Sequence, residues 1–173
     1  LGAGGTAIKT DDLMRLRVIA DRQGFLVAFP QGVGRNWNDG RTGSGSGAEN
    51  EGVDDVGFLI AVLDDVNRKL PVDQARVYAT GISNGAFMST RLACEAASRF
   101  AAIAVVAGTG PADMARECRP ERATSVLIFS GTDDPLVPFE GGEITSFLGL
   151  QKRGRIVSAV EYAGFWTAAN GCS

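Results

Sequence analysis

One short segment sets the architecture of this chain: Val77-Tyr78-Ala79-Thr80-Gly81-Ile82-Ser83-Asn84-Gly85-Ala86-Phe87. Residues 76–80 are typical of a strand, and residues 87–97 are typical of a helix. The Gly-x-Ser-x-Gly pattern between them is so short that the strand must turn directly into the helix. The flanking glycines avoid clashes between the packed strand and helix, while the turn strains the serine backbone. The segment therefore predicts a strand–turn–helix unit with the Ser83 hydroxyl projecting above a sheet.

The rest of the chain alternates short apolar runs with longer amphipathic ones, as in strands and helices stacked on a parallel sheet. Residues 31–52 are rich in glycine and lack periodicity, so they predict a long surface loop whose residues 43–47 behave as a flexible linker. No internal repeat or domain boundary is visible. We expect one α/β domain over residues 1–173, a mostly parallel sheet flanked by helices, with further strands at 25–29, 101–106 and 125–129 and helices at 10–21, 53–70 and 157–170.

Composition excludes several classes of function. The 173 residues carry a net charge of −3, which argues against a nucleic-acid surface or an anionic-membrane surface, because both need clustered Lys and Arg. The sequence contains no run of about 18 apolar residues that could span a membrane. It also contains no histidine. The chain alone therefore cannot build a His-ligated zinc or haem site, or a Ser-His-Asp triad.

Two glycine-rich segments are candidates for chemistry. A serine on a strand-to-helix turn is the arrangement of a nucleophile elbow, in which Ser83 attacks and the Asn84 N–H helps to bind an oxyanion. The alternative is a tight turn with a serine N-cap. Residues 2–7 fit a loose dinucleotide-binding pattern, but the strand at 25–29 ends in Pro30-Gln31 instead of an acid that would hold a ribose. A glycine turn or a loop of N–H donors is therefore favoured there over a nicotinamide site.

An acidic pair follows the expected strand at 125–129. Asp133 and Asp134 lie at its carboxyl end, which is where an open parallel sheet places functional loops. A carboxylate there would orient and stabilise an imidazolium, and the chain order Ser then Asp is the one that α/β-hydrolases use. Asp134 is the better candidate and Asp133 its rival. The alternative is an Asx-type turn before Pro135.

Four segments together resemble a known family: residues 81–85, 91–95, 131–138 and 37–40. They are similar to the polyhydroxybutyrate depolymerase and feruloyl esterase-like serine esterases, in the broad group of carbohydrate esterase family 1. The resemblance implies an α/β-hydrolase fold that needs no metal or cofactor. It implies that Ser83 is the acylated nucleophile, that Asp134 is the triad acid, and that the backbone N–H groups of Asn84 and Ala3 form the oxyanion hole.

The resemblance also implies roles for other residues. Cys94 and Cys118 would form a disulfide and Cys172 would pair with a cysteine further along, which favours an extracellular or periplasmic protein. Trp37 and Asn38 are candidates for the substrate pocket, although Trp37 could equally anchor its loop by burying its ring. The expected partner is an ester substrate: a polyester, a feruloylated or acetylated polysaccharide, or a small aryl ester.

The family's catalytic histidine has no counterpart among these residues. We therefore expect a fragment truncated at both ends, without the first strands and without the histidine-bearing part, that is inactive or nearly so by itself. The alternative function is a non-catalytic relative that binds a polymer or another ligand on the same scaffold.

Overall fold

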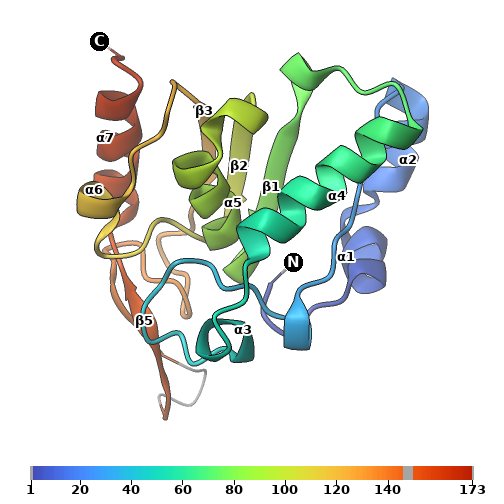
Figure 1. Cartoon of the computed structure of the whole chain (residues 1–173). Helices are drawn as coiled ribbons and strands as arrows, with labels where there is room; N and C mark the ends of the chain where they lie inside the picture. Colours follow the sequence, from blue (N-terminus) through green and yellow to red (C-terminus); the bar gives the residue numbers. More distant parts are fainter. Residues whose placement is uncertain (1, 146–149, 173) are drawn as a thin grey trace.

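The computed structural model describes residues 2–145 and 150–172. In this part of the chain the main sheet has the order β1-β2-β3, all parallel, with β1 at Tyr78–Ile82, β2 at Ala102–Val106 and β3 at Ser125–Phe129. The parallel register requires a crossover after β1, and helix α5 (Asn84–Glu95) supplies it. The α/β-hydrolase-type arrangement predicted from the sequence, a parallel sheet flanked by helices, is confirmed (Figure 1).

The other helices and turns lie around this sheet (Figure 1). Several begin with side-chain caps: for example, the Asp54 carboxylate accepts the Gly57 N–H at 2.8 Å, and Ser158 forms a reciprocal capping box with Glu161. These helices and turns are α1 (Ala7–Met14), α2 (Leu16–Gln23), α3 (Gly47–Asn50), α4 (Asp55–Lys69), α6 (Met114–Glu117), α7 (Ala159–Ala169) and three-residue 3-10 turns at Val33–Arg35, Gln74–Arg76 and Ala97–Arg99.

Helix α5 lies between α4 and α7 and carries most of the core (Figure 1). On the α7 side, Ala86 and Ala93 pack with Ile103 and Val105 of β2 and with Tyr162 of α7. On the α4 side, other residues of α5 join Trp37 and the apolar stripe of α4 in a second cluster: Met88, Leu92, Val56, Leu59 and Ile60. The helix that follows Ser83 is thus held from both sides.

The opposite face of the sheet is more exposed. Side chains alternate between faces along a strand, so Tyr78, Leu127 and Phe129 point away from α5. Their exposed fractions are 63%, 55% and 55%. The apolar residues of β3 are therefore divided between a covered face and an uncovered one.

The strand expected at residues 25–29 is wrong. These residues have no regular secondary structure, and the side chains of Phe25 and Leu26 are exposed. A strand exists only through hydrogen bonds to a neighbour, and β1 pairs with β2 alone among the described residues. An apolar run without such a partner does not form a strand.

The single helix expected at residues 10–21 is also wrong. It is two helices, α1 and α2, because Arg15 between them has a φ of 52°. This left-handed residue ends α1 through its N–H bond to the Asp11 carbonyl at 2.7 Å. Leu13 is exposed, so the helical spacing of apolar residues here does not mark a core face.

Residues 43–47 do not behave as a flexible linker. The Glu49 carboxylate accepts hydrogen bonds from the Gly43 N–H at 2.6 Å, the Gly45 N–H at 3.0 Å and the Ser44 hydroxyl at 2.6 Å. The Ser46 hydroxyl in turn accepts the Glu49 N–H and caps α3. These bonds close the segment into an ordered turn.

A hairpin that the sequence did not indicate completes the fold. Strand β4 (Gly142–Thr145) pairs antiparallel with β5 (Lys152–Ile156), and the pairing is irregular between Glu143 and Thr145. Ile156 packs against Phe87 of α5. The hairpin therefore lies close to the start of the central helix.

Candidate active site

Ser83 lies between β1 and α5 in a strained backbone conformation, with φ 53° and ψ −122°. Its N–H donates to the Val106 carbonyl at 2.9 Å, which extends the sheet ladder by one bond. Its carbonyl accepts the N–H groups of Ala86 and Phe87, which starts the helix. The Ser83 side chain makes no capping hydrogen bond. The hydroxyl is thus held at the strand end without being used as a cap.

The glycine at the start of the pattern is required by close packing. A Cβ added to Gly81 would lie 2.2 Å from the carbonyl oxygen of Gly85 and 2.8 Å from the Ala86 nitrogen. Both atoms belong to the backbone, so no side-chain movement could relieve the clash. The sharp turn therefore requires glycine at position 81.

Two backbone segments lie next to Ser83: the start of α5 and the segment that contains Gly2. Asn84 is the first residue of α5, where backbone N–H groups have no intrahelical acceptor and carry the positive end of the helix dipole. The Gly2 segment lies alongside, because a Cβ on Gly2 would be 3.7 Å from the Ser83 Cβ. The Gly4 N–H holds this segment in place by donating to the Arg35 carbonyl at 2.9 Å. The structure thus brings the loop that contains Ala3 beside the serine turn.

Asp134 lies on the loop that follows β3. Its Oδ1 accepts the N–H groups of Leu136 and Val137, each at 2.9 Å. Asp134 is half-buried, whereas Asp133 is exposed. The Asx-type turn that the sequence left open is therefore present, and it leaves Oδ2 of Asp134 outside this turn.

Ser83 and Asp134 follow the carboxyl ends of β1 and β3, which are the two outer strands of the main sheet. Strand spacing places those ends about 10 Å apart, since each neighbour adds about 4.8 Å. A buried cluster joins the two segments, because Phe87 on the first turn of α5 packs against Val137. The two residues thus lie at the same end of the sheet, on either side of β2.

Trp37 anchors its loop in the core. Its ring is 4% exposed and stacks on Phe58 of α4, with the ring centroids 6.5 Å apart. Its N–H and its carbonyl both bond to the side chain of Asn84, at 2.8 and 3.0 Å. Of the two alternatives for Trp37, the structure favours the loop anchor over the pocket wall.

Asn38 is also used within the protein. Its N–H donates to the Asp55 carboxylate at 2.6 Å and its Nδ2 to the Val53 carbonyl at 3.0 Å, while its carbonyl accepts from Arg91 at 2.6 Å. Burial raises the pKa of Asp55 above its usual range, against the opposing effects of the Asn38 N–H and the Arg91 charge. Asn38 therefore joins the loop to the start of α4 and to the second half of α5.

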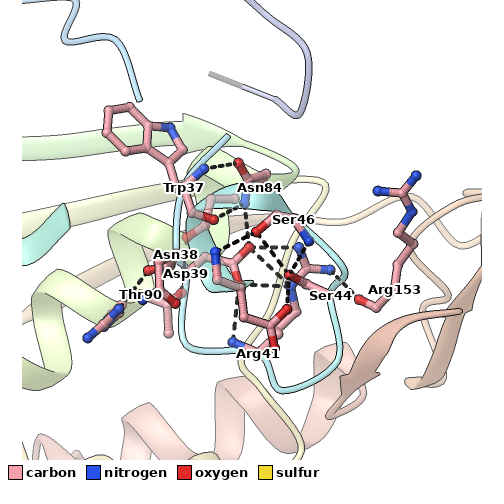
Figure 2. Close-up of polar contacts among 12 residues, drawn as sticks. Trp37, Asn38, Asp39, Arg41, Ser44, Ser46, Asn84, Thr90 and Arg153 are labelled. Carbon is pink, nitrogen blue, oxygen red and sulfur yellow. Dashed lines mark hydrogen bonds and ion pairs between the residues drawn. The ribbon is translucent and has the colours of Figure 1, made fainter. Parts of the chain in front are cut away.

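Sequence reasoning missed Asp39 and Arg41, which form a buried ion pair beside Asn84 (Figure 2). The Arg41 Nη2 lies 2.7 Å from the Asp39 Oδ2, and the Asn84 Nδ2 donates to the same oxygen at 2.6 Å. A charged pair two residues apart in a glycine-rich loop has no periodicity that would indicate burial. The only available signal was the presence of opposite charges close to Trp37.

The disulfide implied by the family resemblance is present. Cys94 of α5 is bonded to Cys118, the residue that follows α6, and Cys172 is free and exposed. Among residues 2–145 and 150–172, no helix is both long and apolar enough to cross a bilayer. The same residues contain no group of three or more acidic or cysteine side chains that could hold a metal ion.

A family model described as Esterase PHB depolymerase matches residues 3–126. The chain belongs to this esterase family. The matched range includes Ala3, the Trp37 loop and the turn at Ser83, but it ends within β3, before Asp134.

Individual proteins that are similar to this chain are also named as esterases. "Putative esterase NocK" of Nocardia uniformis subsp. tsuyamanensis is 36% identical over 140 residues, which are 81% of this chain and 40% of that protein. Feruloyl esterase B of Piromyces equi is 30% identical over 179 residues, covering 98% of this chain and 31% of that protein. Feruloyl esterase C of Emericella nidulans is 36% identical over 101 residues, covering 58% and 36%. The chain thus spans about a third to two fifths of the length of these relatives.

Proposed function

We propose that this PHB depolymerase-family chain carries the nucleophile and the oxyanion hole of a serine carboxylic ester hydrolase. Ser83 Oγ attacks the ester carbonyl, the N–H groups of Asn84 and Ala3 bind the developing oxyanion, and Asp134 orients the base. The alcohol leaves and an acyl-Ser83 intermediate forms, which water then hydrolyses to the acid. The observation that carries this proposal is the strained backbone of Ser83 at the start of α5, with φ 53° and no capping bond from its hydroxyl.

The proposal requires a base that these residues do not contain. The chain has no histidine, and serine is essentially un-ionised at neutral pH. Removing the histidine of a serine triad lowers turnover by about 10⁶-fold and leaves about 10³–10⁴-fold over water from the oxyanion hole and binding. We therefore expect the chain alone to be inactive or nearly so, with the imidazole supplied by residues outside these 173.

Two assays on the purified chain test this. With p-nitrophenyl acetate, wild type and Ser83→Ala should release p-nitrophenol at the same slow rate. A turnover of about one per second that Ser83→Ala abolishes would contradict the missing base, since that rate is typical of a complete enzyme. With an excess of a p-nitrophenyl alkylphosphonate at pH 9, and with imidazole added to supply the missing base, peptide mass spectrometry should find a phosphonate on Ser83 within hours. Labelling of several other serines at equal rates, with none on Ser83, would overturn the proposed nucleophile.

The proposed substrates are polyesters and feruloyl or acetyl esters of polysaccharides. This choice rests on the family description and on relatives that are named feruloyl esterases. An extracellular or periplasmic location is proposed with it, because a disulfide such as Cys94–Cys118 persists in oxidising compartments.

A second candidate is a ligand-binding protein that does no chemistry. The absence of histidine favours it, because a complete triad cannot form from this chain. The phosphonate assay separates the two functions. A pure binding protein would leave Ser83 no more reactive than exposed serines such as Ser98, whereas the proposed hydrolase scaffold would label at Ser83 first.

A further inference from the structure

The Asp39–Arg41 ion pair is deeply buried. Asp39 is 2% exposed and Arg41 7%. The guanidinium approaches the carboxylate through Nε at 3.1 Å and Nη2 at 2.7 Å. Burying two charges costs more than their attraction returns unless further hydrogen bonds satisfy them. The partners of this pair therefore indicate what holds it in the interior.

One partner is the side chain of Asn84. Its Nδ2 donates to the Asp39 Oδ2 at 2.6 Å and to the Trp37 carbonyl at 3.0 Å, and its Oδ1 accepts the Trp37 N–H at 2.8 Å (Figure 2). Both amide hydrogens and the amide oxygen are thus used within one buried network. The Asn84 side chain has no freedom to rotate without breaking bonds that water cannot replace.

The second contact on the same helical turn is with the buried side chain of Phe87. The Arg41 guanidinium lies over the Phe87 ring, 4.1 Å from its centroid, and its Nη1 donates to the Arg153 carbonyl at 3.1 Å. Asn84 and Phe87 are three residues apart and so lie on one side of α5. The ion pair therefore holds the first turn of α5 at two points.

From these contacts we infer that Asp39 and Arg41 are positioning residues for the oxyanion hole, acting through Asn84. This inference rests on the proposed function, in which the Asn84 N–H receives the oxyanion. That N–H belongs to the peptide that follows the strained Ser83, so its direction changes if the first turn of α5 relaxes. An oxyanion donor must lie within about 2.7–3.1 Å of its target, and a misplacement of about 1 Å can cost about 10²-fold in rate.

The Asp39–Arg41 pair could be buried only because it stabilises its own loop. The test must therefore measure chemistry at Ser83. In the phosphonate reaction, Ser83 Oγ forms the P–O bond, p-nitrophenolate leaves and the serine proton passes to the buffer. The phosphoryl oxygen then takes the place of an ester oxyanion. The labelling rate therefore reports on the donors, whereas a loop staple alone would not affect it.

The experiment compares wild type, Asp39→Asn and a control, Asp73→Asn. Asp39→Asn is isosteric but removes the charged acceptor of Asn84, while Asp73→Asn removes the exposed ion pair with Arg76. We expect at least a tenfold slower labelling of Ser83 for Asp39→Asn and a change of less than twofold for the control. In the labelled wild type, the ¹⁵N–¹H signal of Asn84 should move downfield, as for a new hydrogen bond, and it should move less in labelled Asp39→Asn.

The outcomes are distinguishable. No label on Ser83 of the wild type overturns the proposed function and this inference together. Equal labelling of Ser83 in wild type and folded Asp39→Asn, with equal Asn84 shifts, overturns this inference alone. If circular dichroism shows Asp39→Asn to be unfolded, Arg41→Lys decides the question, because it keeps the charge and loses the planar fork. A rate two- to tenfold below wild type supports the inference, and a wild-type rate overturns it.

Discussion

The Arg41 guanidinium lies 4.1 Å from the centroid of the Phe87 ring. Phe87 belongs to the first turn of α5, four residues after Ser83. The same ring packs against Val137, three residues after Asp134. One aromatic side chain thus joins a charged loop, the serine turn and the acidic segment. Arg41 is part of the protein's framework, although arginines are usually on the surface.

Replacing Arg41 by methionine should destabilise the protein strongly. Methionine would fill the space of the arginine stem, but it would leave the Asp39 carboxylate buried without its counter-ion. Breaking a buried pair by removing one partner costs about 3–5 kcal/mol. Urea denaturation followed by circular dichroism should show a loss of this size in the free energy of unfolding.

Arg76→Met is the matched control for that measurement. Arg76 also pairs with an aspartate, Asp73, at 2.7 Å, but both side chains are solvent-exposed. Exposed pairs contribute little to stability. A loss for Arg41→Met no greater than that for Arg76→Met would contradict a structural role for the buried pair.

Gly81→Ala should disrupt the turn at Ser83. The new methyl group would lie 2.2 Å from the Gly85 carbonyl oxygen, so β1 and α5 would have to separate. Overpacking of this kind costs about 1–3 kcal/mol, and phosphonate labelling of Ser83 should fall in parallel. Gly164→Ala in α7 is the control, because nothing lies within 4 Å of its added methyl group. It should stabilise the protein by up to about 1 kcal/mol. Equal effects of the two substitutions would show that close packing at Gly81 is unimportant.

Removing the disulfide should destabilise the chain without abolishing the turn. Cys94 and Cys118 are 24 residues apart, and closing a loop of that length restricts the unfolded chain by about 3.5 kcal/mol. The double substitution Cys94→Ala/Cys118→Ala should lower the thermal midpoint, as measured by differential scanning calorimetry. Cys172→Ala should leave it unchanged, because that thiol is exposed and free. The idea fails if dithiothreitol shifts the wild-type midpoint no more than that of the double variant.

The turn at Ser83 and β3 could be predicted from sequence because local chemistry specifies them. The spacing of Gly81 and Gly85 reflects a backbone contact four residues apart, and residues 126–129 are a continuous apolar run that the structure contains within a strand. The helix at 53–70 was equally predictable, since α4 has its apolar stripe, its Asp54 cap and a following Pro71. In each case the information lies within one short stretch of sequence.

The features that could not be predicted depend on contacts between segments that are distant in the sequence. Residues 25–29 have strand composition but no partner in the described sheet, so pairing overrides propensity. Strand β5 has the reverse character: Lys152–Ile156 is mostly polar and forms a strand because β4 pairs with it. The burial of Asp39 and Arg41 likewise depends on Asn84, 45 residues away from Asp39. No local pattern could have indicated these arrangements.

Stability should depend on pH through Asp55. Burial raises the pKa of this carboxyl above its unfolded value of 3.8, although the Asn38 N–H and the Arg91 charge lower it in part. In the window between the unfolded and folded pKa values, the folded state binds more protons than the unfolded state. Stability therefore falls as pH rises through that window, and the ionised carboxylate costs stability at neutral pH. Asp55→Asn keeps an oxygen to accept the Asn38 N–H. Urea denaturation should therefore show that its free energy of unfolding, relative to that of the wild type, is higher at about pH 7 than at about pH 3.5.

Asp73→Asn should show the opposite trend in the same measurement. Hydrogen bonds from the Arg76 side chain and the Ala75 N–H lower the pKa of Asp73, so its contribution to stability is present above the unfolded value and is lost as pH falls. The free energy of unfolding of Asp73→Asn, relative to that of the wild type, should therefore be lower at neutral pH than in acid. One carboxyl is buried beside Asn38 and the other is exposed beside Arg76. If the relative free energies of unfolding of both variants changed in the same direction with pH, these opposite environments could not explain the pH dependence.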